Sequence, residues 1–240
     1  MTPPGFVLDG SAFFGGVPVF ENIALEAAAG QWTCLLGPSG VGKTTVLRHL
    51  ASLEDSAGFD GRIAASDGGT LPGRIAYMAQ SDLLMPWLDV RSNIRLGPRL
   101  RREPVDDAQV ERLIDRVGLS DHATKRPGAL SGGMRQRVAL ARTLLEDRPV
   151  VLLDEPFSAL DARTRAEMQE LAAELLFGRT VMMITHDPAE AARLGHRILM
   201  LTGQGLTEMA PPSSDPIRDY DDPQVFACQA TLMDIIRRAA

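Results

Sequence analysis

The stretch Gly37-Pro-Ser-Gly-Val-Gly-Lys43-Thr44 decides the fold of this 240-residue chain. It matches the pattern G-x-x-x-x-G-K-[ST], in which glycines let successive backbone N–H groups converge on phosphate. That pattern requires a strand before the loop and a helix after it. The apolar run Trp32–Leu36 precedes the loop, and Lys43–Leu53 follows with apolar residues at helical spacing. The sequence therefore predicts a loop that binds phosphate between a buried strand and a helix.

The candidate phosphate ligands are the residues of this loop and the first residues of the helix after it. They are Gly37, Pro38, Ser39, Gly40, Val41, Gly42, Lys43, Thr44 and Thr45. Lys43 can reach the β- and γ-phosphates of a nucleotide, and the Thr44 hydroxyl can bind Mg²⁺. Of the 25 basic residues only Lys43 and Lys125 are lysines. A lysine kept in so arginine-rich a chain indicates a position that arginine cannot fill.

Outward from the loop, predicted strands and helices alternate, which is typical of an α/β fold with a mainly parallel sheet. Short apolar runs predict the strands, and apolar residues with a period of about 3.6 predict the helices. The predicted strands are 74–80, 150–153, 180–185 and 198–201, and the predicted helices are 106–117, 132–145, 163–176 and a terminal helix ending at Arg238.

The chain is predicted to form a single domain, 1–240, with two departures from this alternation. Residues 6–27 carry alternating apolar positions on either side of Gly15–Gly16, which predicts an N-terminal antiparallel β subdomain. From about 86 to 145 only helices are predicted, so this stretch is expected to be a helical subdomain inserted in the α/β core. The Gly-, Asp- and Ser-rich stretch 58–73 is expected to form a hairpin or loops.

Composition excludes several classes of protein. The net charge of −6 argues against a nucleic-acid-binding surface, so no nucleic-acid partner is expected. The apolar runs fall far short of the ~20 residues that span a bilayer, and the first residues lack the pattern of a secretion signal. The only cysteines, Cys34 and Cys228, indicate a reducing compartment, and no short His/Cys spacing indicates a zinc site.

A second motif places two carboxylates after a buried strand. The apolar run Val150–Leu153 is followed by Asp154-Glu155-Pro156. In phosphate-loop proteins such a strand ends in a carboxylate that faces the magnesium ion. Asp154 is thus the candidate for holding Mg²⁺, and Glu155 can polarise the attacking water as a general base.

A third motif, Leu130-Ser-Gly-Gly-Met-Arg-Gln-Arg137, stands at the start of the predicted helix 132–145. Ser131 is a suitable N-cap, and Gly132 and Gly133 offer bare backbone N–H groups to an anion. One chain would then have two phosphate-binding helix starts, whereas one nucleotide rarely needs two from one subunit. Either two ligands bind, or two subunits share one.

Taken together, the motifs resemble the nucleotide-binding subunit of ATP-binding cassette (ABC) transporters from Phe14 to about Leu201. The ordered set is Gly37–Thr44, Gln80, Leu130–Gln136, Asp154–Glu155, Ser158–Asp161 and His186. The resemblance implies a P-loop NTPase core, with ATP and Mg²⁺ as cofactors. It also implies an ATPase whose hydrolysis of ATP to ADP and phosphate is coupled to transmembrane transport.

The resemblance also implies a role for each matched residue. Glu155, His186 and Gln80 would be catalytic, and Thr44, Gln80 and Asp154 would hold the metal. Ser131, Gly132 and Gly133 would close on the γ-phosphate bound by the other protomer, and Asp161 would communicate across the dimer. Phe14 would stack on adenine, although the family usually has Tyr there; Phe13 in that role, or a plain core aromatic at 14, are the alternatives. Met134 replaces the more common Gln, and activity is expected to survive.

The partners follow from the same resemblance. The chain would form a head-to-tail homodimer on two membrane-spanning permease subunits, served indirectly by a periplasmic or lipid-anchored solute-binding protein. It would lie peripherally on the cytoplasmic face of the inner membrane. The alternatives are an ABC ATPase of DNA repair or the ribosome, an exporter or lipoprotein-release ATPase, and a small-molecule kinase. The first usually has a long coiled coil or two cassettes, and the kinase would not need Leu130–Gln136.

The transported solute is predicted from resemblance alone. Gln80–Trp87, Lys125–Met134 and Thr185–Pro188 are similar to the nitrate, sulfonate and taurine importer group, which includes importers of hydroxymethylpyrimidine, a thiamine precursor. We expect the thiamine-precursor branch, with aliphatic sulfonate, taurine or nitrate as the alternative.

Two further surfaces are predicted. The apolar residues Leu84, Met85 and Trp87 lie between chain-breaking residues and are expected to dock a short helix of the membrane subunit. Packing under the helical insertion is the alternative. Three arginines at 135, 137 and 142 share one helix with apolar neighbours, which favours a solvated or inter-subunit face over a nucleic-acid stripe.

Overall fold

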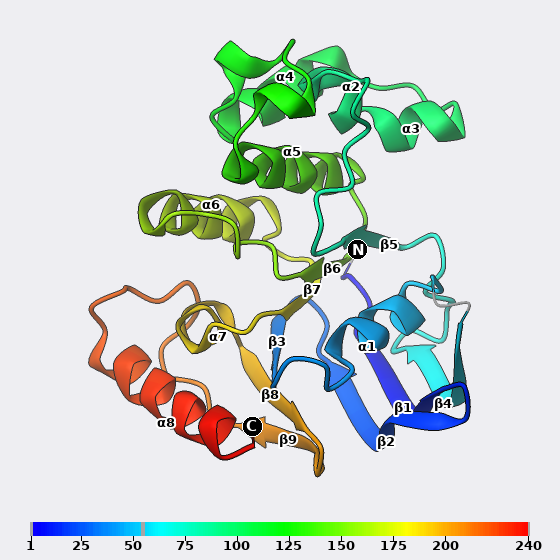
Figure 1. Cartoon of the computed structure of the whole chain (residues 1–240), viewed down its shortest axis with the longest axis vertical. Helices are drawn as coiled ribbons and strands as arrows, with labels where there is room; N and C mark the ends of the chain where they lie inside the picture. The colour runs from blue at the N-terminus through cyan, green and yellow to red at the C-terminus, as the bar shows by residue number, and fades with distance from the viewer. Residues whose placement is uncertain (1, 54–55, 240) are drawn as a thin grey trace. The chain divides into compact units, whose positions relative to one another are not determined.

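The computed structural model describes residues 2–53 and 56–239 (Figure 1). The described residues form two compact units, one from within 1–75, 149–155 and 177–240, and the other from 76–148 and 156–176. We refer to them as the first and the second unit. In chain order the elements are β1 (Phe6–Phe14), β2 (Val17–Ala27), β3 (Trp32–Leu36), α1 (Lys43–Leu50), β4 (Ala57–Ala65), β5 (Ile75–Met78), α2 (Val90–Ile94), α3 (Leu96–Arg101), α4 (Asp107–Arg116), η1 (Ser120–His122), η2 (Pro127–Ala129), α5 (Gly132–Leu145), β6 (Val150–Asp154), α6 (Ala162–Leu175), β7 (Thr180–Ile184), α7 (Pro188–Leu194), β8 (Arg197–Thr202), β9 (Gly205–Met209) and α8 (Pro223–Ala239).

An antiparallel sheet of order β2-β1-β4 opens the first unit. β1 and β2 form a hairpin whose register runs from Phe6 opposite Ala27 to Phe14 opposite Val17. Gly15 and Gly16 make the turn, and both have the positive φ that two-residue hairpin turns of this kind require. The predicted N-terminal antiparallel sheet is confirmed.

A mostly parallel sheet forms the centre of the first unit, with β6, β7, β3, β8 and β9 side by side in that order. β3 pairs in parallel with both β7 and β8, β6 pairs in parallel with β7, and β9 is antiparallel to β8. Every residue of β3, β6 and β7 is buried. Continuous apolar runs therefore became the central strands, as expected for a parallel sheet covered on both faces. The predicted α/β fold class is confirmed.

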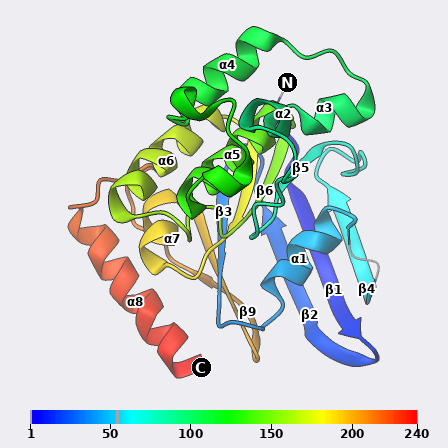
Figure 2. The same cartoon turned by 45° about the horizontal axis from the view of Figure 1, so that its top comes forward.

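The last helix of the first unit packs against α7, as both views of the chain show (Figures 1 and 2). Arg218, which is 4% exposed, ties the preceding loop to α7. Its guanidinium donates to the carbonyl oxygens of Ala192 at 2.7 Å and Gly195 at 2.9 Å, and to that of Pro212 at 3.0 Å. The Pro- and Asp-rich stretch before α8 is thus held by one buried cation.

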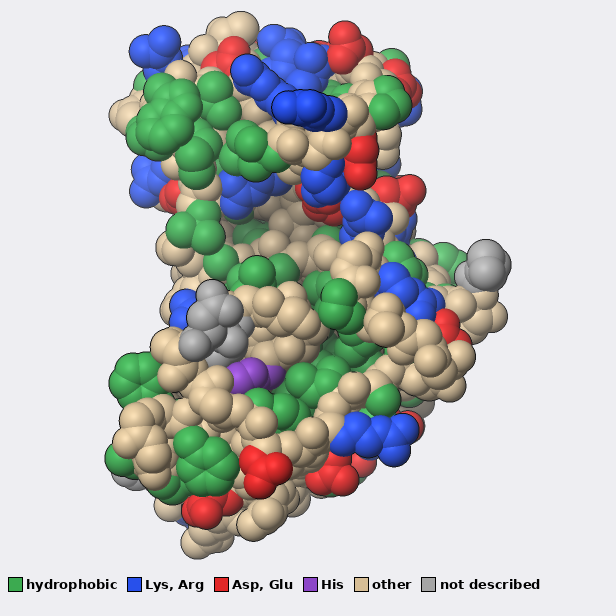
Figure 3. All heavy atoms as spheres, turned by 90° about the vertical axis from the view of Figure 1, so that its right-hand side faces the viewer, with side chains coloured by type: hydrophobic (Ala, Val, Ile, Leu, Met, Phe, Trp, Pro, Cys, Tyr) green, Lys and Arg blue, Asp and Glu red, His purple; other side chains and the backbone are tan. Residues whose placement is uncertain are grey.

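The second unit is helical apart from the residues it contributes to β5. Both α2 and α4 pack against α5. Figure 3 shows basic side chains gathered over this unit at the top of the view, with acidic ones among them. Several are paired: Arg91 Nη2 lies 3.0 Å from Glu111 Oε2, and Arg101 Nη2 lies 2.7 Å from Glu146 Oε2.

One stretch differs from its prediction. Residues 58–73 were expected to form a hairpin or loops, but β4 pairs with the whole of β1, from Phe14 opposite Ala57 to Phe6 opposite Ala65. β4 is an edge strand of its sheet, and most of its side chains are partly or fully exposed. It therefore lacks the alternating apolar pattern by which a strand is recognised in a sequence.

Candidate functional site

The phosphate loop is pressed between two strands of the first unit. Gly37 has φ +153°, and a Cβ atom there would lie 2.1 Å from the carbonyl oxygen of Leu201 on β8. Gly42 has φ +101°, and a Cβ atom there would lie 2.8 Å from Cγ1 of Val19 on β2. Only glycine fits at both positions, so the backbone of the loop is free of side chains where it turns into α1.

Helix α1 begins at this loop without a side-chain cap, since its N-cap residue is Gly42. At α2, α4, α5, α6 and α7, by contrast, a Ser or Asp side chain accepts a hydrogen bond from the first turn. The first N–H groups of α1 therefore donate to no N-cap side chain, and the helix dipole favours an anion there. This is the local geometry that the motif predicts for phosphate.

Lys43 is the cation of the loop and is only 8% exposed. Its Nζ donates to the carbonyl oxygens of Gly37 and Pro38, each at 2.8 Å. Burial lowers the pKa of Lys43, whereas the negative charges of Glu155 and Asp154 act to raise it. The ammonium is thus held close to two carboxylates, in a place where a charge-assisted contact with phosphate is strong.

The strand order explains why these carboxylates meet the loop. Asp154 ends β6 opposite Ile184 of β7, and β7 lies next to β3, which leads into the phosphate loop. The carboxyl ends of parallel strands share one edge of a sheet, which is where ligands bind in open α/β sheets. Asp154 is 1% exposed. Glu155 turns away from the strand with φ +49° while its N–H donates to the carbonyl oxygen of Ile184 at 3.0 Å.

The structure brings Glu155 and His186 together at this edge. His186 Nδ1 lies 3.0 Å from Glu155 Oε2, and the side chain of His186 is 61% exposed against 17% for Glu155. The backbone beside His186 is fixed, because the Thr185 hydroxyl donates to Glu190 at 2.6 Å and accepts from the N–H of Asp187 at 3.0 Å. The pair presents a carboxylate, oriented by an imidazole, that can accept a proton from water.

The third motif lies in the second unit and begins α5 as predicted. Ser131 Oγ accepts a hydrogen bond from the N–H of Met134 at 3.2 Å, and Gly132 is the first residue of the helix. In the same unit Asp161 caps α6 by accepting from the N–H of Thr164 at 3.0 Å. Hydrogen bonds from the backbone and the side chain of Thr164 hold the pKa of Asp161 below its usual range.

Comparisons with known proteins identify the family of this chain. Residues 20–158 match the family model described as ABC transporter. The chain belongs to the ABC transporter family. It is therefore an ATP-binding ABC chain, and its enzymatic class is that of the ATPases coupled to transport.

Two similar ABC proteins are both named as aliphatic sulfonates import ATP-binding proteins. SsuB 1 of Rhodococcus jostii is 44% identical over 225 residues, covering 92% of this chain and 88% of that protein. SsuB 2 of Burkholderia cenocepacia is 40% identical over 235 residues, covering 94% of this chain and 84% of that protein. Among solved structures, a bacterial Atm1-family ABC exporter with ATP bound matches with a TM-score of 0.77 and 26% identity. That match covers 96% of this chain but 42% of the exporter chain.

The ABC site has the donors for Mg²⁺ bound together with a nucleotide. Thr44 supplies a hydroxyl beside the loop, and the buried Asp154 supplies a carboxylate at the edge where β6 ends. Within residues 2–53 and 56–239, no group of three or more His, Cys, Asp or Glu side chains could hold a metal ion. A site with only a few protein oxygens suits Mg²⁺, because this ion usually takes its remaining ligands from phosphates and water.

The aromatic residues at the end of β1 differ in exposure. Phe14 is 61% exposed and pairs across the hairpin with Val17, which is 67% exposed, while Phe13 is half-buried. Of the two rings, the structure presents Phe14 to solvent. Its predicted role on adenine stays a prediction.

Gln80 follows β5 and is exposed at the start of the segment 80–88, which belongs to the second unit. Its side chains divide between the interior and the surface, and docking of a membrane subunit stays a prediction. Leu84 is packed inside at 8% exposure, whereas Trp87 is 66% exposed. The sequence did not single out Leu83, which is 57% exposed beside the buried Leu84. Two adjacent leucines give no local signal of which one faces solvent.

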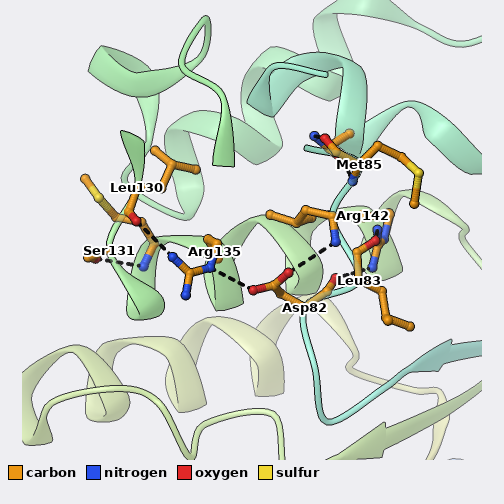
Figure 4. A network of polar contacts seen from close by, with 10 residues as sticks. Asp82, Leu83, Met85, Leu130, Ser131, Arg135 and Arg142 are labelled. Atoms are coloured by element: carbon orange, nitrogen blue, oxygen red, sulfur yellow. Dashed lines mark hydrogen bonds and ion pairs between the residues drawn. The ribbon is translucent and has the colours of Figure 1, made fainter. Parts of the chain in front are cut away.

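Arginines of α5 bind this segment, which the sequence did not predict (Figure 4). Arg135 Nε donates to Asp82 Oδ2 at 2.8 Å. Arg142 donates to the carbonyl oxygens of Leu83 at 2.9 Å and Asp82 at 2.7 Å. Arg135 and Arg142 therefore do not face solvent alone, because their long side chains reach back to their own chain, and an inter-subunit role of this face stays a prediction. The seven-residue spacing of Arg135 and Arg142 on one helix face was the available signal.

No helix within the described part of the chain is long and apolar enough to cross a membrane.

Proposed function

We propose that this chain is the ATP-hydrolysing subunit of an ABC importer for a small organic solute. The contact between Glu155 and His186, at the sheet edge that also holds the lysine of the phosphate loop, carries the proposal. It joins a phosphate-binding element to a group able to activate water. Neither element alone would distinguish hydrolysis from simple nucleotide binding.

In the proposed mechanism the phosphate loop and Lys43 bind the phosphates of ATP. Thr44, Asp154 and Gln80 would hold Mg²⁺, which supplies positive charge to the phosphate oxygens. Glu155 takes a proton from the attacking water, and His186 holds the Glu155 carboxylate in place through Nδ1. Charge that develops on the phosphate oxygens is stabilised by the N–H groups at the start of α1 and by Lys43.

The second phosphate-binding helix start supports a head-to-tail homodimer. Ser131, Gly132 and Gly133 would close on the ATP held by the phosphate loop of the partner, with Asp161 communicating across the dimer. With two-fold symmetry, each of the two ATP sites then contains the start of α1 from one protomer and the start of α5 from the other. We further propose that residues 1–240 form one ABC ATPase domain, in which about 86–145 is the helical subdomain bearing this motif, and that Phe14 stacks on adenine.

The chain would act on the cytoplasmic face of the inner membrane, attached to two permease subunits that a solute-binding protein serves. Leu83 and Trp87 form an exposed apolar pair in segment 80–88, suited to a short helix of the permease. The polar network beneath them fixes the backbone that carries both side chains.

Import, and the nature of the solute, are supported by relatives rather than by residues of this chain. Both curated relatives described above are named as import proteins for aliphatic sulfonates. Their names favour the sulfonate alternative within the importer group. The expected thiamine precursor, hydroxymethylpyrimidine, is supported only by the resemblance of the motifs.

Replacing Glu155 tests the mechanism. Glu155→Gln keeps the shape of the side chain and removes its basicity, so ATP should still bind while turnover falls by about a thousandfold. We expect an ATP-bound dimer in size-exclusion chromatography, because hydrolysis no longer releases it. Hydrolysis at the wild-type rate would remove Glu155 from the role of base.

The solute is tested on the binding protein that works with this transporter. Calorimetric titration with ethanesulfonate, taurine, nitrate and hydroxymethylpyrimidine should show binding of a sulfonate. Binding of hydroxymethylpyrimidine without any response to sulfonates would reverse this preference. Neither result would alter the ATPase assignment, since the binding protein is a separate chain.

A further inference from the structure

The two carboxylate oxygens of Asp82 have different partners (Figure 4). Oδ1 accepts from the N–H of Leu84 at 3.2 Å and so closes a turn within segment 80–88. Oδ2 accepts from Nε of Arg135 at 2.8 Å, on the first turn of α5. One side chain therefore shapes the segment and also joins it to the helix.

Arg135 continues the connection to the start of α5. Its Nη1 donates to the carbonyl oxygen of Leu130 at 3.0 Å, and its own N–H donates to the carbonyl oxygen of Ser131 at 3.0 Å. Leu130 is 6% exposed and directly precedes the N-cap. A planar guanidinium has a fixed angle between its donors, so a shift of Asp82 is passed to the turn at Leu130 and Ser131.

Other contacts hold the segment without joining it to that turn. Arg142 binds the carbonyl oxygens of Asp82 and Leu83, two helical turns beyond Arg135. The Asn93 side chain binds the backbone of Met85, accepting at 2.8 Å and donating at 3.2 Å. These contacts are made to backbone groups, so they do not depend on which side chain stands at position 82.

We propose that Asp82 and Arg135 are positioning residues that transmit docking of the permease to Ser131–Gly133. The proposal rests on the proposed function, in which Leu83 and Trp87 dock the permease and Ser131–Gly133 meet the ATP of the partner. Docking on Leu83 moves the adjacent Asp82, Arg135 follows, and the start of α5 is aligned for ATP. The side chain of Arg135 is 37% exposed and that of Asp82 29%, and ion pairs so exposed add little to stability, so removing the contact should leave the fold intact.

The contact is tested first on the isolated chain by hydrogen exchange. Asp82→Ser keeps a hydroxyl for the turn but cannot reach Arg135, so exchange of the amides of 131–135 should rise about threefold. Arg135→Gln should do the same. The matched control is Glu111→Gln, which breaks the Arg91 pair, of similar exposure, in the same unit. Unchanged exchange at 131–135, or an equal rise in the control, would overturn the proposal.

Transmission is tested in the complex with the permease subunits in lipid nanodiscs. The measured quantity is the ratio of the hydrolysis rate in the complex to that of the isolated chain. Asp82→Ser and Arg135→Gln should each lower this ratio about tenfold. The double variant should lose no more than either single variant, because both remove one contact. Independent, additive losses would refute a shared contact.

The two proposals fail in different ways. A wild-type chain that forms no complex with a permease refutes the proposed function and, with it, the transmission. The exchange experiment still decides whether Asp82 holds the start of α5. If hydrolysis is stimulated in the wild-type complex and equally stimulated in the complexes of the variants, the transmission alone is refuted.

Discussion

Two histidines on either side of α7 have different tasks because their ring nitrogens meet different groups. Nδ1 of the exposed His186 faces the carboxylate of Glu155. Nδ1 of the half-buried His196 instead accepts from the N–H of Trp32 at 3.1 Å, beside the first residue of β3. Only a neutral imidazole can accept there, and burial lowers the pKa of His196 accordingly. His186 thus takes part in the proposed chemistry, whereas His196 holds the start of β3 through its hydrogen bond with Trp32.

His196 makes stability depend on pH. The unfolded chain binds a proton at an ordinary histidine pKa near 6.5, whereas the folded chain binds it only at lower pH. Stability is therefore complete above about pH 6.5 and falls as the pH drops from there toward the folded value. We expect a small loss of stability between pH 7.5 and 5.5, because partial exposure of the ring reduces the effect. His196→Asn keeps an acceptor but does not titrate, so urea unfolding of this variant should lose that part of the pH dependence. An identical pH profile in variant and wild type would contradict the assignment.

At the scale of elements, segment 80–88 is a short loop held like a structural element. Asn93 of α2 and Arg142 of α5 bind its backbone, and Asp82 closes its internal turn. The apolar side chains of Leu83 and Trp87 stay exposed on this fixed backbone. A rigid backbone that presents exposed apolar groups loses little conformational entropy when a partner binds.

Trp87→Ala should therefore weaken co-purification with the permease subunits. Loss of an anchoring tryptophan costs about 2 kcal/mol of binding free energy, or roughly thirtyfold in affinity. The matched control is Leu100→Ala on α3, since Leu100 is 74% exposed in the same unit. It should assemble normally, and neither variant should change the melting temperature, because both side chains are exposed. Equal assembly of both variants would place the docking surface elsewhere.

At the scale of the whole molecule, the predicted ligands of ATP are divided between the two units. The first unit carries Lys43, Asp154, Glu155 and His186, and the second carries Gln80 and Ser131–Gly133. In the proposed homodimer each site combines the phosphate loop of one protomer with the Ser131 motif of the other. A substitution that disables either element then inactivates both sites of a dimer in which both protomers carry it. In a dimer of two different variants, both substitutions can fall in one site and leave the other site intact.

Mixing two inactive variants tests this division. Lys43→Ala removes the cation of the phosphate loop, and Ser131→Arg blocks the start of α5. In a mixed dimer one site carries both lesions and the other carries none, so an equal mixture should recover about a quarter of the wild-type hydrolysis rate. The measurement is ATPase activity before and after mixing, with each variant alone as control. No recovery would show that each protomer completes its own site, or that the two sites work only together.

The sequence by itself determined the features that depend on neighbouring residues. The phosphate loop was indicated by its glycines, a lysine and a hydroxyl, which lie between the apolar run Trp32–Leu36 and a helical pattern. The structure has β3 and α1 on either side of this loop. The predicted helix 132–145 has the bounds of α5, because Ser131 is a strong N-cap signal. Strands alternating with helices were sufficient for the fold class.

Tertiary structure alone decided which distant residues meet. Glu155 reaches His186 because β6 and β7 pair in parallel register, and β4 joins β1 although its own sequence resembles a loop. The burial of Leu84 beside the exposed Leu83, and the reach of Arg135 to Asp82, depend on how α5 packs in its unit. The physical reason is that periodicity and capping act over a few residues, whereas strand register and side-chain partners are fixed by contacts far apart along the chain.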